Sequence, residues 1–339
     1  LPLLEKQPSN LFFIRPRRFG KSIFLSMLRT YYDIAQKEKF EKRFSNLWIG
    51  SRPTQLQGTF QILFLDFSRV GGLDGTLAQN FDDYCCGGLD DFASIYEPYY
   101  YPGFEDEMKA QCGTTNKLNF LDRKARNNGS KLYLIVDEYD NFTNVVLNEQ
   151  GDKVYHALTH ASGFYREIFK KFKGMFERIF MTGVSPVTLD DLTSGFNIGW
   201  NISTDHQFNM MLGFSETDVR EMLQYYKDAG QLPGNTNIDT MIDEMRPWYD
   251  NYCFAEESLE RDPKMFNCDM VFYYLRHYMT LGKSPKEMID PNTRTDYNKM
   301  KKLIRLDKLD GNRKGVLRKI TEDGQIVTTL TTTFPATDI

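Results

Sequence analysis

Long apolar runs are missing from this sequence of 339 residues, and no segment approaches the roughly 18 consecutive apolar residues of a membrane-spanning helix. A signal-peptide pattern is also missing from the first residues. Both absences favour a cytoplasmic protein that has no membrane partner.

Cysteine and histidine are scarce, with five and four residues respectively. The cysteines show neither the paired spacing of a zinc site nor a disulfide framework, which predicts free thiols in a reducing compartment. His156 and His160 could lie one helical turn apart, but no third metal ligand accompanies them. The formal net charge of −4 argues against bulk binding of a polyanion and leaves only local basic patches.

The most informative stretch that is present runs from Arg15 to Ser22. It follows an apolar, strand-like run at residues 11–14 and precedes an amphipathic, helix-like run at residues 22–32. Gly20, Lys21 and Ser22 therefore stand where a strand, a loop and a helix meet. In a phosphate-binding loop of this kind, backbone amides hold the phosphates, the Lys ammonium reaches them, and the Ser hydroxyl ligates Mg²⁺.

This loop departs from the plain pattern G-x-x-x-x-G-K-[ST], because Arg15 stands at the first Gly position. Arg15 requires ordinary backbone angles, and Pro16 stiffens the entry to the loop. The loop arginines add positive charge beside the phosphates, or one of them anchors the loop to a neighbouring carboxylate. A Gly-Lys-Ser sequence alone also fits a simple helix start. The candidate cofactor-binding residues are Arg15, Pro16, Arg17, Arg18, Phe19, Gly20, Lys21, Ser22 and Ile23.

A second motif, at residues 131–140, is a buried-strand run that ends in acids. Asp137 and Glu138 come at its carboxyl end, where open α/β sheets bind ligands. These positions match a Walker-B strand, in which Asp137 would hold the metal together with Ser22, and Glu138 would polarise the attacking water. The alternative is that the acids only end a strand. Two motifs in one chain, each in its expected context, favour a nucleotide site.

A further short strand at residues 178–181 leads into Thr182. In NTPases that insert one strand between the phosphate-loop strand and the Walker-B strand, that strand ends in a polar group that senses the γ-phosphate. Thr182 is the candidate, with Ser185 as the second choice. The alternative is turn chemistry ahead of Pro186. Together with Glu138 and Lys21, Thr182 completes the predicted catalytic set.

Four stretches now carry a resemblance: residues 12–22, 135–140, 182–186 and 248–254. Together they resemble the predicted AAA-ATPase-like family of bacterial P-loop NTPases, and the similarity of arrangement extends over nearly the whole chain. It implies a P-loop NTPase fold of the ASCE/AAA-like kind, with a three-layer α/β/α core around a parallel sheet. It also implies ATP and Mg²⁺ as cofactors. Members often continue into a PD-(D/E)xK nuclease-like domain, of which no convincing constellation is seen here.

The pattern of apolar runs and turn signals predicts two parts. Residues 1–212 would form the P-loop core, with a variable insertion of short helical pieces near residues 69–128. Residues 213–339 would form a mainly helical lid or small domain that ends in a β-hairpin near residues 316–330.

The sequence therefore predicts an α/β protein that binds Mg²⁺-ATP and hydrolyses its γ-phosphate through Lys21, Ser22, Asp137 and Glu138. A nucleotide-gated switch with little turnover is the alternative, and an interaction module with a decayed site is the third class. Three partner classes stay open: a nucleic acid, a fused or separate nuclease-like domain, and further copies of the chain.

Overall fold

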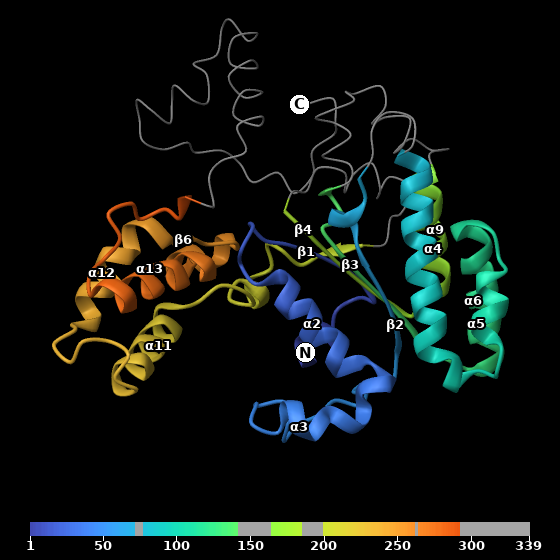
Figure 1. Cartoon of the computed structure of the whole chain (residues 1–339), viewed down its shortest axis with the longest axis horizontal. Coiled ribbons are helices and arrows are strands. Elements are labelled where there is room, and N and C mark those ends of the chain that lie inside the picture. Colours follow the sequence, from blue (N-terminus) through green and yellow to red (C-terminus); the bar gives the residue numbers. More distant parts are fainter. Residues whose placement is uncertain (72–76, 142–163, 185–198, 262–263, 292–339) are drawn as a thin grey trace, which may run out of the picture. The chain divides into compact units, whose positions relative to one another are not determined.

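The computed structural model describes residues 1–71, 77–141, 164–184, 199–261 and 264–291 (Figure 1). These residues form two compact units. The first contains the described residues of Leu1–Gly213 and Cys253–Pro263, and the second those of Phe214–Tyr252 and Lys264–Thr332. The chain thus leaves the first unit after Gly213 and returns to it at Cys253. No feature of the sequence predicted this return.

Five parallel strands form the sheet of the first unit, in the order β2-β3-β4-β1-β5. Strand β3 is buried along its whole length, as expected for a parallel strand that is covered on both faces. The predicted α/β class with a parallel sheet is confirmed, and β4 lies between β1 and β3. The strands are β1 (Asn10–Ile14), β2 (Gln61–Asp66), β3 (Leu132–Asp137), β4 (Arg178–Gly183) and β5 (Trp200–Asn201).

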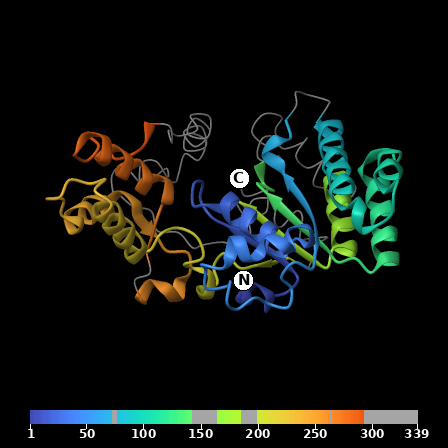
Figure 2. The same ribbon diagram turned by 60° about the horizontal axis from the view of Figure 1, so that its bottom comes forward.

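Helices cover both faces of this sheet and make three layers (Figures 1 and 2). Helix α2 (Lys21–Tyr32) packs on one face, where the rings of Phe24 and Phe180 lie 5.8 Å apart and those of Tyr32 and Tyr133 lie 5.5 Å apart. The main apolar core fills the other face, between the sheet and helices α4 (Leu77–Tyr96), α6 (Gly113–Asn128) and α9 (Phe164–Met175). Two short helices, α1 (Pro2–Glu5) and α3 (Phe40–Phe44), complete the N-terminal part.

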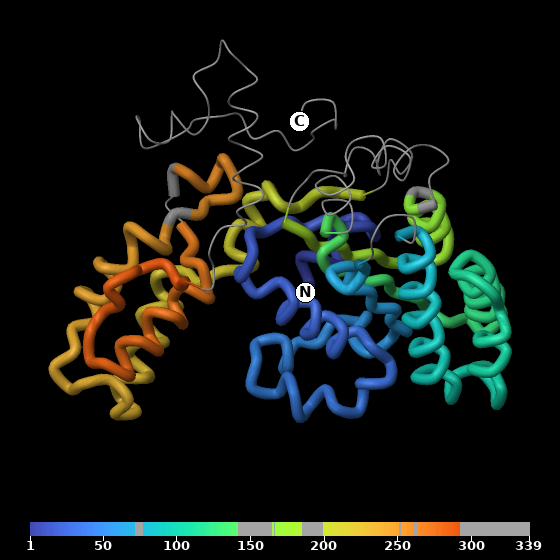
Figure 3. The backbone as a smooth tube through the Cα atoms, turned by 45° about the horizontal axis from the view of Figure 1, so that its top comes forward, coloured from blue at the N-terminus to red at the C-terminus, as the bar shows by residue number. Residues whose placement is uncertain are grey.

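Helix α4 runs unbroken for 20 residues, whereas the sequence predicted short helical pieces there. Gly87 and Gly88 do not interrupt it, because packing on the sheet outweighs their low helix propensity. A Cβ atom on Gly88 would lie 2.8 Å from Cδ2 of Leu65 in β2. The glycine thus allows close approach, and α4 belongs to a layer of the core. With α5 (Phe104–Lys109) and α6 it forms a group of neighbouring helices (Figure 3).

Two tyrosines of α4 cover the outer edge of β2. The hydroxyl of Tyr96 accepts a hydrogen bond from the amide of Ile62 at 2.9 Å, and that of Tyr84 accepts one from the amide of Asp66 at 2.8 Å. Tyr96 in turn donates to Asp33 at 2.9 Å. Because β2 lies at the edge of the sheet formed by the described strands, these contacts satisfy amides that none of those strands reaches.

The second unit packs three helices around its own apolar core: α11 (Glu216–Asp228), α12 (Ile238–Tyr249) and α13 (Cys268–Leu281). Strands β6 (Asp250–Tyr252) and β7 (Met265–Phe266) pair antiparallel beside them. A capping box of Ser215 and Asp218 starts α11. The His156–His160 pair and the expected hairpin near residues 316–330 lie outside the described residues. None of the described helices is long and apolar enough to cross a membrane.

Candidate functional site

The loop between β1 and α2 has the backbone shape of an anion cradle. Gly20 has φ of +90°, and a Cβ atom there would meet nothing within 4 Å. Glycine is therefore favoured at this position by backbone conformation and not by lack of space. Gly20 is also the N-cap of α2, which makes no side-chain capping hydrogen bond. The first amides of α2 are thus available to an anion.

Lys21 closes this loop on itself. Its side chain is 5% exposed, and Nζ donates to the carbonyl oxygens of Arg15 at 3.0 Å and Pro16 at 3.1 Å. Burial lowers the pKa of Lys21, whereas Glu138, Asp137 and Asp140 act in the opposite direction. The ammonium is therefore held beneath the loop, close to a group of carboxylates.

The other loop residues divide into buried and exposed ones. Phe19 is buried, whereas Arg17, Arg18 and Ser22 are exposed and Ile23 is 79% exposed. Arg18 has φ of +69°, a conformation in which non-glycine residues are uncommon. Arg17, Arg18 and Ile23 are thus exposed near the start of α2.

Asp137 is the centre of a hydrogen-bond network that joins three segments of the chain. Its Oδ2 accepts from the hydroxyl of Ser22 at 2.7 Å, and its Oδ1 accepts from the hydroxyl of Thr182 at 2.7 Å and from the amide of Glu138 at 3.0 Å. The bonds to Oδ1 orient the carboxylate, so that Oδ2 faces α2. The structure thus brings Ser22 and Asp137 together, as the sequence predicted, and adds Thr182 to them.

The oxygens of Ser22 and Asp137 fit a magnesium ion. Mg²⁺ prefers hard oxygen ligands at about 2.0–2.1 Å and leaves several positions to water and to substrate phosphates, so two protein oxygens suffice. Within the described parts of the chain, no group of three or more His, Cys, Asp and Glu residues could hold a metal by itself. A metal at this site would therefore depend on phosphate oxygens as well.

Glu138 follows at the end of β3 in an uncommon backbone conformation, with φ of +51°. Such a conformation costs of the order of 1–2 kcal/mol for a non-glycine residue and is concentrated at functional sites. Burial raises the pKa of Glu138; Lys21 opposes this rise, and Asp140 and Asp137 add to it. The carboxylate is half-buried, and no hydrogen bond to it is found in the part of the chain that the structure describes.

Asp140 and Gly183 lock the turn after β3 onto the end of β4. The carboxylate of Asp140 accepts from the amide of Val184 at 3.2 and 3.1 Å, and the amide of Tyr139 donates to the carbonyl of Thr182 at 3.0 Å. A Cβ atom on Gly183 would lie 2.4 Å from Oδ1 of Asp140, so only glycine fits. This contact holds Thr182 beside Asp137. Ser185 lies outside the described residues.

Arg15 anchors the loop through carbonyl oxygens and aromatic rings. Its Nη1 donates to the carbonyls of Ile14 and Ser203 at 2.8 Å each, and its Nη2 donates to that of Phe208 at 2.7 Å. The guanidinium lies over the rings of Phe13 and Phe254. Burial lowers the pKa of Arg15 to about 9, so the group keeps its charge at neutral pH.

Sequence reasoning missed the roles of Ser203, Asn209 and Phe254. The hydroxyl of Ser203 accepts from the amide of Ile14 at 2.8 Å, and Oδ1 of Asn209 accepts from the amides of Phe254 at 2.8 Å and Ala255 at 3.1 Å. The family-like stretch at residues 248–254 marked Phe254, but no local signal connected it with the phosphate loop.

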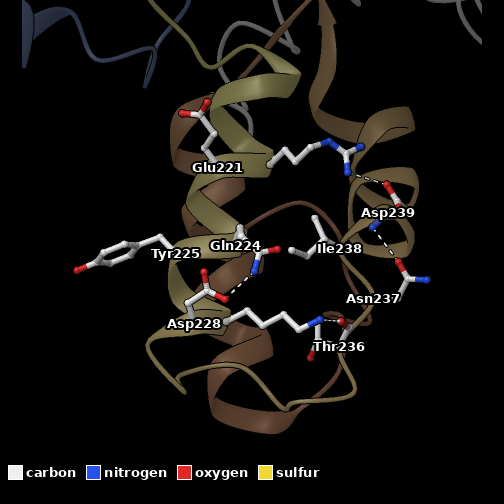
Figure 4. Close-up of a pocket in the computed structure, with 10 residues that line it drawn as sticks. Glu221, Gln224, Tyr225, Asp228, Thr236, Asn237, Ile238 and Asp239 are labelled. Carbon is white, nitrogen blue, oxygen red and sulfur yellow. Dashed lines mark hydrogen bonds and ion pairs between the residues drawn. The ribbon is translucent and has the colours of Figure 1, made fainter.

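A separate hollow of about 860 Å³ lies beside α11 and α12 in the second unit (Figure 4). Arg220 on its wall pairs with Asp239 at 2.6 Å, and Lys227 donates to the carbonyl of Thr236 at 2.8 Å. Its cations are thus engaged, and none of the predicted site residues lines it. The phosphate loop remains the candidate site.

A family model described as a predicted AAA-ATPase matches residues 1–193. An uncharacterized protein in the vnfD 5' region of Azotobacter chroococcum mcd 1 is 27% identical over 263 residues, which cover 76% of this chain and 44% of that protein. The chain thus spans less than half the length of that relative.

Two solved structures are also similar to the chain. Cdc6p from Pyrobaculum aerophilum has 12% identity and a TM-score of 0.36, and the match covers 81% of this chain and 56% of that one. PCH-2 from C. elegans has 13% identity and a TM-score of 0.21, and the match covers 89% of this chain and 71% of that one.

Proposed function

Because the chain belongs to the family of predicted AAA-ATPases, we propose that its first unit binds ATP with Mg²⁺ and hydrolyses the γ-phosphate. One observation carries the proposal. Lys21 and Ser22 at the start of α2 meet Asp137 and Glu138 at the end of β3, with Ser22 and Asp137 joined by a hydrogen bond of 2.7 Å. A cationic group, metal-type oxygens and a carboxylate thus converge beside an uncapped helix N-terminus.

The loop would bind the phosphates first. The amides at the start of α2 would donate to phosphate oxygens, and Lys21 would exchange the carbonyls of Arg15 and Pro16 for the β- and γ-phosphates. Ser22 and Asp137 would hold Mg²⁺, which neutralises negative charge on the phosphates when it is bound. The exposed Arg17 and Arg18 would add positive charge at the mouth of the site.

Glu138 would then orient the attacking water. The water oxygen forms a bond to the γ-phosphorus, and the bond from that phosphorus to the bridging oxygen breaks, with its electron pair leaving on ADP. A proton of the water passes to Glu138 and then to the released phosphate. The raised pKa of Glu138 suits this proton acceptance better than an ordinary carboxylate would. Thr182 would report the state of the γ-phosphate through its bond to Asp137.

A nucleotide-gated switch with little turnover is the second candidate. The observation that favours it is the attachment of the phosphate loop, through Arg15, to residue 254, which closely follows the second unit in the chain. A change in loop conformation on nucleotide binding would then be sensed by a partner or by a fused domain, such as a nuclease-like one. We also propose a cytoplasmic location, binding to nucleic acid and assembly with further copies of the chain.

A thermal-shift series tests binding directly. Wild type, Lys21→Ala and a control, Lys42→Ala, on an exposed position of α3, would be compared with and without Mg²⁺-ATP, Mg²⁺-GTP and Mg²⁺-ADP. A ligand at 100 times its Kd stabilises the folded state by about 2.7 kcal/mol. We expect ATP to raise the Tm of wild type and the control but not that of Lys21→Ala. No shift in any of the three proteins would reject nucleotide binding.

Phosphate release separates the two candidates. Glu138→Gln should keep nucleotide affinity and lose turnover if the chain is an ATPase. Wild type that binds ATP and releases no phosphate, alone or with added DNA, would instead support the switch.

A further inference from the structure

Arg15 occupies a position at which the plain phosphate-loop pattern has glycine, and the structure shows why the larger residue is accommodated. Arg15 is only 1% exposed, and its guanidinium donates hydrogen bonds to the carbonyls of Ser203 and Phe208. Its guanidinium carbon lies 4.1 Å from the centroid of Phe13 and 3.9 Å from that of Phe254. Two rings thus lie against the cation, and three carbonyls accept hydrogen bonds from its Nη atoms, whereas Nε has no partner among the described residues.

Phe254 contacts both ends of the loop. Its ring lies over Arg15 at the start, and it meets the ring of Phe19 near the end edge-on, with centroids 5.5 Å apart and an angle of 81°. Its backbone is held in turn, because Asn209 accepts hydrogen bonds from the amides of Phe254 and Ala255. Asn209 is itself buried.

We propose that Phe254, fixed by Asn209, is a positioning residue of the phosphate loop. It acts through Arg15 and Phe19 and keeps the loop in the shape in which Lys21 lies beneath its carbonyls. Its effect on nucleotide affinity rests on the proposed ATP site, whereas its effect on loop shape does not. In the chain, Phe254 comes two positions after Tyr252, the last residue of the second unit before the chain returns to the first.

Amide hydrogen exchange tests the loop without any nucleotide. Phe254→Leu removes the ring face and keeps an apolar side chain, whereas Phe254→Tyr keeps the ring. Phe40→Leu is the matched control: Phe40 is also half-buried and in aromatic contact with Tyr31 and Phe44, at a distance from the loop in the sequence. We expect amide exchange at Arg15 and at residues 17–21 to rise about tenfold in Phe254→Leu and to stay unchanged in the other two variants.

Nucleotide affinity gives the second measurement. Loss of a desolvated cation–π contact of this kind corresponds to about a tenfold weaker Kd for Mg²⁺-ATP. We expect this loss in Phe254→Leu and in Arg15→Met, and no further loss when the two substitutions are combined. Phe254→Tyr should keep the affinity of wild type. If the substitutions acted through separate structural defects, their losses of affinity would add in the double variant, and Phe254→Tyr would also lose affinity.

The outcomes are distinguishable from a failure of the proposed function. If loop exchange responds as expected but wild type binds no ATP, the positioning role stands and the ATP site is rejected. If loop exchange in Phe254→Leu equals that of wild type, or rises equally in Phe40→Leu, the positioning role is overturned whatever the ATP result.

Discussion

Replacement of Gly183 by alanine tests the junction of β3 and β4 most directly. The added Cβ atom would lie 2.4 Å from Oδ1 of Asp140 and 2.6 Å from Cε1 of Tyr139. Both of these residues are buried, and β4 is held between β3 and β1. Neither the new methyl group nor its neighbours can therefore turn toward solvent, and the turn after β3 must move.

The cost has two parts. Overpacking in a well-packed interior costs about 1–3 kcal/mol. Displacement of Asp140 also breaks its charged hydrogen bonds from Val184, which contributes about 1.5–3 kcal/mol. The midpoint of the sum is roughly 4 kcal/mol, and for a unit of this size each kcal/mol lowers Tm by about 2–4 °C. We therefore expect Gly183→Ala to lower the Tm by about 8–16 °C.

Differential scanning calorimetry of Gly183→Ala beside Gly174→Ala makes the comparison. Gly174 lies in α9, and a Cβ atom there would meet nothing within 4 Å. Because alanine is favoured over glycine in a helix by up to about 1 kcal/mol, the control should keep or slightly raise the Tm. A Tm for Gly183→Ala within 2 °C of wild type, judged against the estimated 2–4 °C per kcal/mol, would refute the close-contact argument.

Three further variants probe other parts of the network. Thr182→Val keeps the side-chain shape but removes a donor to the buried Asp137, and should lower the free energy of unfolding in urea by about 1.5–3 kcal/mol; an unchanged value would show that the bond contributes nothing. Because the pKa of Glu138 is raised, its ionised form costs stability above that pKa. Glu138→Gln should therefore have a higher Tm than wild type at neutral pH, and this gap should close as the pH falls through the raised pKa toward the ordinary value; a gap that widens in acid would contradict the burial. Tyr96→Phe leaves the amide of Ile62 without its acceptor and should cost about 1–3 kcal/mol in the same urea assay, with faster exchange of that amide; an unaffected amide would count against the edge contact.

Strands β1, β3 and β4 and the start of α2 could be predicted because their signals are local, whereas the short strands β5, β6 and β7 were not predicted. A central parallel strand is a continuous apolar run, and residues 132–137 show it clearly. Glycine before Lys21 and Ser22 marks the loop-to-helix step in the same way. Ser22 and Asp137 are 115 positions apart, yet each sits at the end of a recognisable strand or loop, so topology brings them together.

The rest depended on distant contacts. The sequence predicted short helical pieces near residues 69–128, but the close approach of Leu65 to Gly88 in the unbroken helix α4 is a tertiary effect that no local pattern records. The loop arginines suggested either positive charge beside the phosphates or an anchor for the loop, but the sequence did not indicate that the partners of Arg15 come from residues 203, 208 and 254. The amino-acid composition likewise gave no indication that residues 253–261 belong to the first unit. The predicted division at residue 212 and the roles of the site residues stay predictions.

The enclosure of Arg15 between two rings has an evolutionary consequence. A phosphate loop that exchanges its first glycine for arginine needs an aromatic partner far away in the chain, because a buried guanidinium without one would lose much of its compensation. Arginine at position 15 and phenylalanine at position 254 should therefore covary among related chains. Detection of such loops in genomes would then rest on a paired signature, with one half in the loop and the other some 240 positions downstream.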